Sequence, residues 1–142
     1  MFRTMSETKQ VQFEGAEFTV QMIKRKIFRR LSSELAQAKL EIAGLDELLT
    51  KDALERIQKE SPEKFFRVTA RLNEVYLDFV RYGIADHKGL QAKDGKEILF
   101  KKEGDLISEE TLDHYDLNGL ILKLGTEVIT FNTLGEGERK NS

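Results

Sequence analysis

The chain has 142 residues, of which 39% are hydrophobic and 34% are charged, so it is long enough for one domain with a single core and a highly charged surface. It contains no cysteine, which excludes disulfides, thiolate nucleophiles and zinc sites with cysteine ligands, and which fits a reducing cytoplasm. The net charge is −2 and is spread unevenly: residues 1–40 carry eight Lys and Arg against four Asp and Glu, whereas residues 41–142 carry fifteen against twenty-one.

A first β-hairpin is predicted within residues 9–20. Apolar and polar side chains alternate on both sides of a possible turn at Glu14-Gly15, which is the pattern of half-buried strands. The apolar positions are Val11, Phe13, Phe18 and Val20.

Residues 21–42 change to the period of an amphipathic helix. Apolar side chains recur every three or four residues and form one stripe. The stripe consists of Ile23, Ile27, Leu31, Leu35, Ala38 and Ile42, and Phe28 broadens it. Gly44 is a suitable stop, and a short helix is predicted over 51–59 with Thr50 as its N-cap.

The strongest helical signal begins at Ser61-Pro62. Ser61 can cap, and Pro62 suits the first helical position because its missing N–H costs nothing there. The apolar stripe that follows is Phe65, Val68, Leu72, Val75, Tyr76 and Phe79. Gly83 followed by Ile84 predicts a Schellman-type end, with the glycine in the left-handed conformation.

The last third mixes a hairpin with two helices. A second hairpin is predicted over 88–101, with its turn at Asp94-Gly95. Ser108 is expected to cap a short acidic helix, and Asp116 to cap the last helix, over 117–134. The stripe of that helix is Leu117, Leu120, Ile121, Leu124, Val128, Phe131 and Leu134.

These elements predict an α+β, mainly α-helical fold. We expect a helical bundle with two small β-hairpins, at about 9–20 and 88–101. Residues 1–134 should form a single globular domain, and residues 135–142 a flexible C-terminal tail, because that tail has no apolar side chains.

No catalytic or metal-binding constellation is recognisable. His87 and His114 are the only histidines, and both are interpreted as surface or turn residues, because a metal site needs three or more converging ligands. No Gly-x-Ser-x-Gly elbow is present, and the glycines 135 and 137 follow a helix, whereas phosphate binding needs them before one. We expect no enzyme activity, no cofactor and no metal.

No stretch approaches the roughly 20 apolar residues that a membrane helix needs. The first ten residues also lack the apolar core of a secretory signal. We therefore expect the protein to stay in the cytoplasm of the cell that makes it.

The basic excess of the first forty residues is concentrated in one short segment. Its members are Lys24, Arg25, Lys26, Arg29 and Arg30. On a helix, Lys26, Arg29 and Arg30 share one side, so the segment is either a solvated face, a surface for a protein partner or a phosphate-binding surface. The acidic remainder and a pI near 5.8 disfavour a general DNA binder.

Two aromatic residues of the 62–82 helix are further candidates for contact with a partner. Phe66 lies off the apolar stripe, and Tyr82 lies near the end of the helix. Exposed aromatic side chains mark interaction surfaces more often than polar ones do.

Three segments carry a resemblance to a known group of proteins. Residues 79–90 read FVRYGIADHKGL, residues 93–100 read KDGKEILF, and residues 132–142 read NTLGEGERKNS after an apolar helix. A Gly-Ile…Gly turn, an Asp-Gly hairpin ending in Phe and a Glu-Arg-Lys-Asn-Ser tail make the chain similar to small proteins of tailed bacteriophages and prophages, described as tail assembly chaperones or minor morphogenesis proteins. At His87 those proteins often carry tryptophan.

The resemblance, which covers about residues 79–142, implies a non-enzymatic role. A tail assembly chaperone holds the tape-measure protein soluble and recruits tail-tube proteins, acting in the cytoplasm of the host cell. A structural subunit of the tail or of the head–tail junction is one alternative. A small DNA-associated or regulatory protein that uses residues 24–30 is another, and self-association into a homo-oligomer is left open.

Overall fold

The computed structural model of the protein describes residues 2–43 and 51–141, and the side chains of residues 2–41 and 55–133. Its elements are β1 (Thr8–Phe13), β2 (Ala16–Gln21), α1 (Arg25–Ala43), α2 (Lys51–Glu60), α3 (Pro62–Gly83), β3 (Ile84–Lys88), β4 (Lys102–Glu103), β5 (Leu106–Ile107), α4 (Glu109–Leu117) and α5 (Ile121–Asn141). The strands form two antiparallel sheets, β1-β2-β3 and β4-β5. The predicted α+β, mainly helical class is confirmed.

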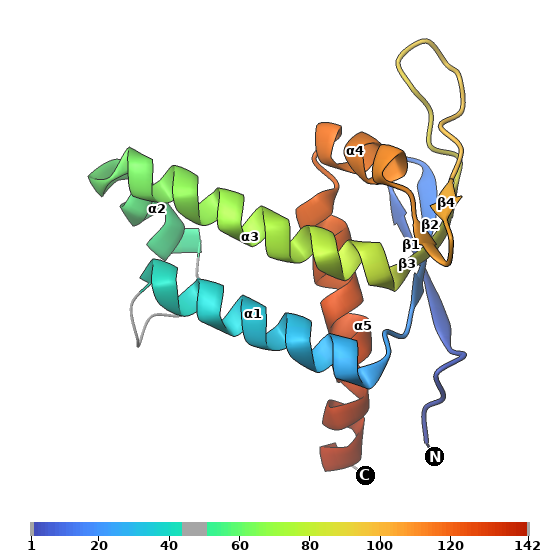
Figure 1. The fold of residues 1–142 in the computed structure, drawn as a ribbon, viewed down its shortest axis with the longest axis horizontal. Helices are drawn as coiled ribbons and strands as arrows, with labels where there is room; N and C mark the ends of the chain where they lie inside the picture. Colours follow the sequence, from blue (N-terminus) through green and yellow to red (C-terminus); the bar gives the residue numbers. More distant parts are fainter. Residues whose placement is uncertain (1, 44–50, 142) are drawn as a thin grey trace.

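Figure 1 shows α1, α2 and α3 projecting together as an arm, which we define as residues 24–43 and 51–83. Helices α1 and α3 run antiparallel along the arm, and α2 lies at its far end. The remaining elements form the body, in which α5 crosses α3 and packs on β2. The arm is therefore joined to the body at one end only.

The first hairpin is confirmed. Strands β1 and β2 pair with Phe13 opposite Ala16, and the turn residues Glu14 and Gly15 both have positive φ, 51° and 84°. Such a turn matches the twist of the strands that it joins. The third strand of this sheet, β3, pairs with β2 and was not predicted, because its residues follow α3 without a break.

Helix α1 confirms the second predicted element, although it begins at Arg25 because Gln21 still belongs to β2. The stripe buries Phe28, Leu31, Leu35 and Ala38. Helix α2 confirms the short helix and buries Ile57. The expected stop at Gly44 and the expected cap at Thr50 lie outside the described residues.

Helix α3 begins as predicted, with the Ser61 hydroxyl accepting a hydrogen bond from the Lys64 N–H and with Pro62 at the first position. The predicted Schellman end at Gly83 is wrong. Gly83 is the last helical residue, and the chain passes directly into β3 at Ile84 (φ −105°, ψ 119°). Gly83 is required for packing instead, because a Cβ there would lie 2.2 Å from Cγ1 of Val128 in α5.

The second predicted hairpin is present without regular strands. Gly95 has a φ of 84° and Gln91 bridges to Glu97. Two backbone hydrogen bonds flank this bridge, from the Ala92 N–H to the Lys96 carbonyl and from the Ile98 N–H to the Leu90 carbonyl. The two-stranded sheet β4-β5 lies just beyond, around Gly104. The Ile98 carbonyl is bound by the ring of His87, as described below.

Ser108 caps α4 as predicted, but Asp116 does not begin the last helix. Asp116 lies in the last turn of α4, Leu117 is 84% exposed, and α5 begins only at Ile121. Gly119 has a φ of 67°, its N–H donates to the Asp116 carbonyl, and the Leu120 N–H donates to the Tyr115 carbonyl. These two bonds are the Schellman motif, which ends α4 and moves the start of the last helix from the predicted residue 117 to residue 121.

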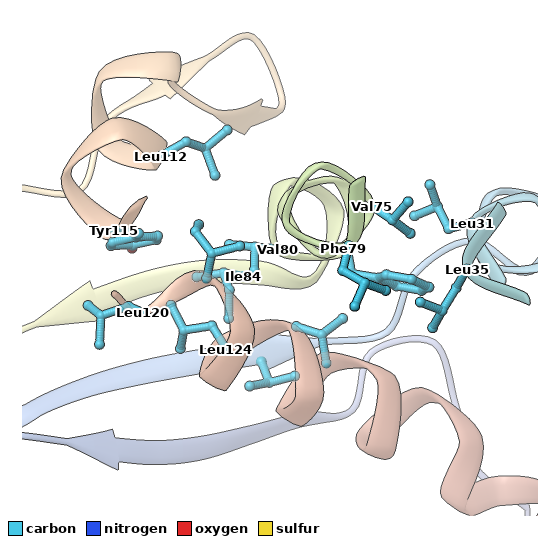
Figure 2. Close-up of a cluster of buried hydrophobic side chains, with 14 of the residues drawn as sticks. Leu31, Leu35, Val75, Phe79, Val80, Ile84, Leu112, Tyr115, Leu120 and Leu124 are labelled. Atoms are coloured by element: carbon cyan, nitrogen blue, oxygen red, sulfur yellow. The ribbon is translucent and has the colours of Figure 1, made fainter. Parts of the chain in front are cut away.

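One continuous core joins the arm to the body, as the labelled side chains of Figure 2 show. Phe79 packs edge-on against Phe28 of α1, with ring centroids 5.9 Å apart, while Tyr115 packs against Phe18 of the sheet. Helix α5 extends through Asn141, and the mobility of residues 135–142 stays a prediction.

Candidate interaction surfaces

Four of the five predicted cations lie exposed at the start of α1. Lys24, Lys26, Arg29 and Arg30 point away from the buried stripe of the helix. None of them makes an ion pair or a side-chain hydrogen bond with any residue that the structure describes. We call these four residues the basic face.

Arg25 is separated from the basic face, because its guanidinium turns towards the body. It donates to the carbonyl oxygens of Ile23 and Asn132 and to the side-chain oxygen of Asn132. It also lies over the ring of Phe28, 4.7 Å from the centroid. Arg25 thus holds α1 against α5 and is engaged by the protein itself.

The basic face opposes the electrostatics of its own helix. The N-terminus of a helix carries a partial positive charge, which favours acidic side chains and disfavours basic ones. The first turn of α1 contains no acidic residue, and Lys24 and Lys26 flank Arg25 there. Residues that destabilise their own secondary structure are expected mainly at functional sites.

The basic face and the two predicted aromatic residues do not form one site. Phe66 is 75% exposed, whereas Tyr82 is half-buried against the core and accepts a hydrogen bond from Gln21 through its carbonyl. The start of α1 faces the end of α3, as the contact between Phe28 and Phe79 shows. Phe66 lies thirteen residues before Phe79, which is about 20 Å along the helix.

A second group of cations on α3 was missed by the sequence analysis. Lys64, Arg67 and Arg71 line a hollow of about 280 Å³ together with Val68 and with Glu41 of α1. Their spacing of three and four residues on one helix was the available signal. The arm therefore carries positive side chains on both of its long helices.

The surface interpretation of His87 is wrong. Its ring is 6% exposed, within 5.9 Å (centroid to centroid) of the rings of Phe18, Phe100 and Tyr115. Nε2 lies 2.6 Å from the Ile98 carbonyl oxygen, so this nitrogen must carry the proton and donate. In the neutral ring Nδ1 then accepts from the Tyr115 hydroxyl, 2.5 Å away. Both nitrogens are used inside the fold, so His87 does not face a substrate.

Tyr115 is perturbed by the same surroundings. Burial raises the pKa of its hydroxyl well above the usual value, and the nearby charge of Asp86 adds to that rise. The other histidine, His114, lies half-buried near the end of α4, where its backbone carbonyl accepts from Asn118. Neither histidine meets a cluster of carboxylates: among the described residues, no three His, Cys, Asp or Glu side chains group as metal ligands would.

A larger hollow, of about 500 Å³, opens in the body between the β1–β2 turn, residues 89–92 and the α4–α5 turn. Phe13, Leu90 and Leu120 are its apolar lining residues, and Asn118 lies on its edge. Leu117, next to Asn118, is almost fully exposed. The lining of this hollow is more polar than apolar, so it does not form an apolar docking surface.

Comparison with known proteins gives no relative. No family model matches the chain, and no significant match was found among curated proteins or solved structures. Across residues 2–43 and 51–141, no helix is both long enough and apolar enough to cross a membrane.

Proposed function

We propose that the protein is a non-enzymatic binding factor in the morphogenesis of a tailed bacteriophage or prophage. In this proposal it acts in the host cytoplasm as a tail assembly chaperone that binds the tape-measure or tail-tube protein. The resemblance of residues 79–142 suggests the class of process, and the exposed surfaces suggest the mode of action.

The basic face is the observation that carries the proposal. Its four cations have no partner among the described residues, and Lys24 and Lys26 lie at the helix N-terminus, where positive charge is unfavourable; an anionic partner would compensate for them. Cations within one short helical segment suit an acidic stretch of a protein. A DNA duplex would need a broader positive surface, and the remainder of the chain is acidic.

The surroundings of His87 are compatible with the resemblance. The related phage proteins often carry tryptophan at this position, and an indole N–H can donate to a carbonyl in the way that Nε2 donates to Ile98. The neighbouring rings of Phe18, Phe100 and Tyr115 also offer apolar contacts for such a side chain. Histidine in place of tryptophan at position 87 therefore keeps one aromatic ring and one N–H hydrogen-bond donor.

The test is co-expression of the protein with the tape-measure and tail-tube proteins of the same phage, followed by co-purification. We expect one of them to co-purify, and changing Lys24, Lys26, Arg29 and Arg30 to Gln to reduce recovery at least tenfold. A matched control changes Lys88, Lys93, Lys96 and Lys102 to Gln, which removes the same charge from exposed positions of the body.

Failure of both proteins to co-purify, or an equal loss in the control variant, would overturn the proposal. A DNA-associated role is tested in parallel with duplex DNA across a salt series. Tight binding that weakens steeply with salt and is lost with the basic face would favour that role instead.

A further inference from the structure

The outer edge of β1 is open. β1 is the first strand in the order β1-β2-β3 and pairs only with β2. Phe13 and Ala16 flank the two-residue turn, so they form a hydrogen-bonded pair, and along β1 such pairs recur at every second residue. Val11 and Lys9 therefore bond to β2, while the N–H and C=O groups of Gln10 and Gln12 point away from it.

No described group satisfies these outward-pointing backbone atoms. The backbone hydrogen bonds outside the helices and strands include none from β1, and no side chain bonds to the backbone of Gln10 or Gln12. The side chains of both glutamines are exposed as well. One edge of the sheet thus presents donors and acceptors at the spacing of a strand.

β1 has few of the usual protections of a free edge. Exposed edges are normally guarded by proline, by a bulge or by charged side chains, lysine above all. β1 contains no proline, and the irregularity of this sheet lies between β2 and β3, at Thr19/Val20. Its one lysine, Lys9, reaches across to Glu127 of α5, with 3.4 Å between Nζ and Oε2. β1 is a regular strand of six residues that is ready to pair.

The centre of β1 is symmetric, since Gln10 and Gln12 flank Val11. We propose that β1 pairs antiparallel with β1 of a second copy of this chain, with Val11 opposite Val11 on a two-fold axis. Each Gln10 then lies opposite Gln12 of the second copy, and the two pairs exchange four backbone hydrogen bonds. The two sheets join into one sheet with β1 at its centre.

The symmetry is what selects a second copy over an unrelated strand. In an antiparallel pair, residues directly opposite each other project to the same face of the sheet. With Val11 on the axis, the core-facing side chains of both copies lie on one face and the polar glutamines on the other, so burial is undisturbed. An isologous contact of this kind is also the commonest arrangement in homodimers. It uses no residue of the basic face.

The register is tested by charge pairs on the purified protein. Gln10→Lys with Gln12→Lys places like charges opposite each other in both pairs, whereas Gln10→Lys with Gln12→Glu places opposite charges there. We expect sedimentation velocity over a concentration series to show a dimer for the original chain and for the Lys/Glu variant, and at least a tenfold weaker dimer for the Lys/Lys variant. Equal weakening of both variants would overturn this register.

A second variant keeps the test independent of side-chain charge. Gln10→Pro removes only an N–H that points away from β2, so the hairpin should fold while the dimer is lost. Hydrogen exchange at the amides of Gln10 and Gln12 should slow as the concentration of the original chain rises. A chain that stays monomeric at every concentration, with fast exchange at both amides, would refute pairing with a second copy.

Discussion

The arm and the body use their polar side chains in opposite ways. In the body, His87 and Asn132 are buried and each makes at least two hydrogen bonds that fix one segment against another, and the buried Ser108 hydroxyl caps α4. In the arm, the cations of the basic face have no partner among the described residues. The arm carries thirteen Lys and Arg against eight Asp and Glu, whereas residues 84–142 carry eight against twelve. Buried polar residues of the body hold the fold, whereas the four cations of the basic face are available for contact.

The largest expected effect is a loss of stability when His87, in the body, is replaced. His87→Ala leaves the Ile98 carbonyl and the Tyr115 hydroxyl without partners and opens a cavity, so we expect a loss of about 4 kcal/mol in the free energy of unfolding. Urea denaturation measures this loss. His87→Trp, which restores a ring and a donor, should recover most of it. Equal destabilisation by both substitutions would mean that the aromatic cluster has no room for an indole.

A smaller effect appears at alkaline pH. The pKa of Tyr115 is raised in the folded state, so the unfolded chain loses this proton first and folding stability falls as the pH rises above about 10. At pH 11 the contribution of this one group to the loss is about 1.4 kcal/mol. The difference between the original chain and Tyr115→Phe, followed by urea denaturation from pH 8 to 11, isolates it. A constant difference over that range would contradict the buried, neutral hydroxyl.

The smallest effect should have the opposite sign and lies in the arm. Lys26→Glu places a negative charge in the first turn of α1 and should raise the free energy of unfolding by about 0.3–1 kcal/mol at low ionic strength. Lys39→Glu makes the same charge change in the C-terminal half of α1 and should give no such gain. If Lys26→Glu lowers the free energy of unfolding instead, Lys26 stabilises the fold and does not belong with the cations that are available for contact.

Local signals predicted the elements that depend on neighbours in sequence. The Glu14-Gly15 hairpin, the stripes of α1 and α3 and the Ser61 and Ser108 caps all lie within a few residues of the pattern that specifies them. The fold class followed from these. Gly83 and Gly119 show where local signals fail. Gly119 ends α4, whereas Gly83 makes room for Val128 of α5, and the sequence alone does not distinguish these two roles.

The candidate site was predictable to the same degree. The exposed cations of α1 follow from helical spacing, but the inward turn of Arg25 depends on Asn132, 107 residues away in the chain. His87 stands between Asp86 and Lys88, which suggests a surface position, and it is buried by partners 11 and 28 residues further on. Contacts between residues so far apart in the chain cannot be recognised from the neighbouring sequence.

Asn132 also fixes the arm to the body. Its side-chain amide accepts a hydrogen bond from the Ile23 N–H and donates one to the Gln21 carbonyl. One side chain therefore fixes the segment that connects β2 to α1. At the other attachment Gly83 lets α3 press against α5 and run straight into β3. One attachment is hydrogen-bonded and the other is close-packed, so the arm is fixed to the body at two points. The basic face begins three residues after β2, and a partner bound there would lie directly beside the place where α1 leaves the sheet.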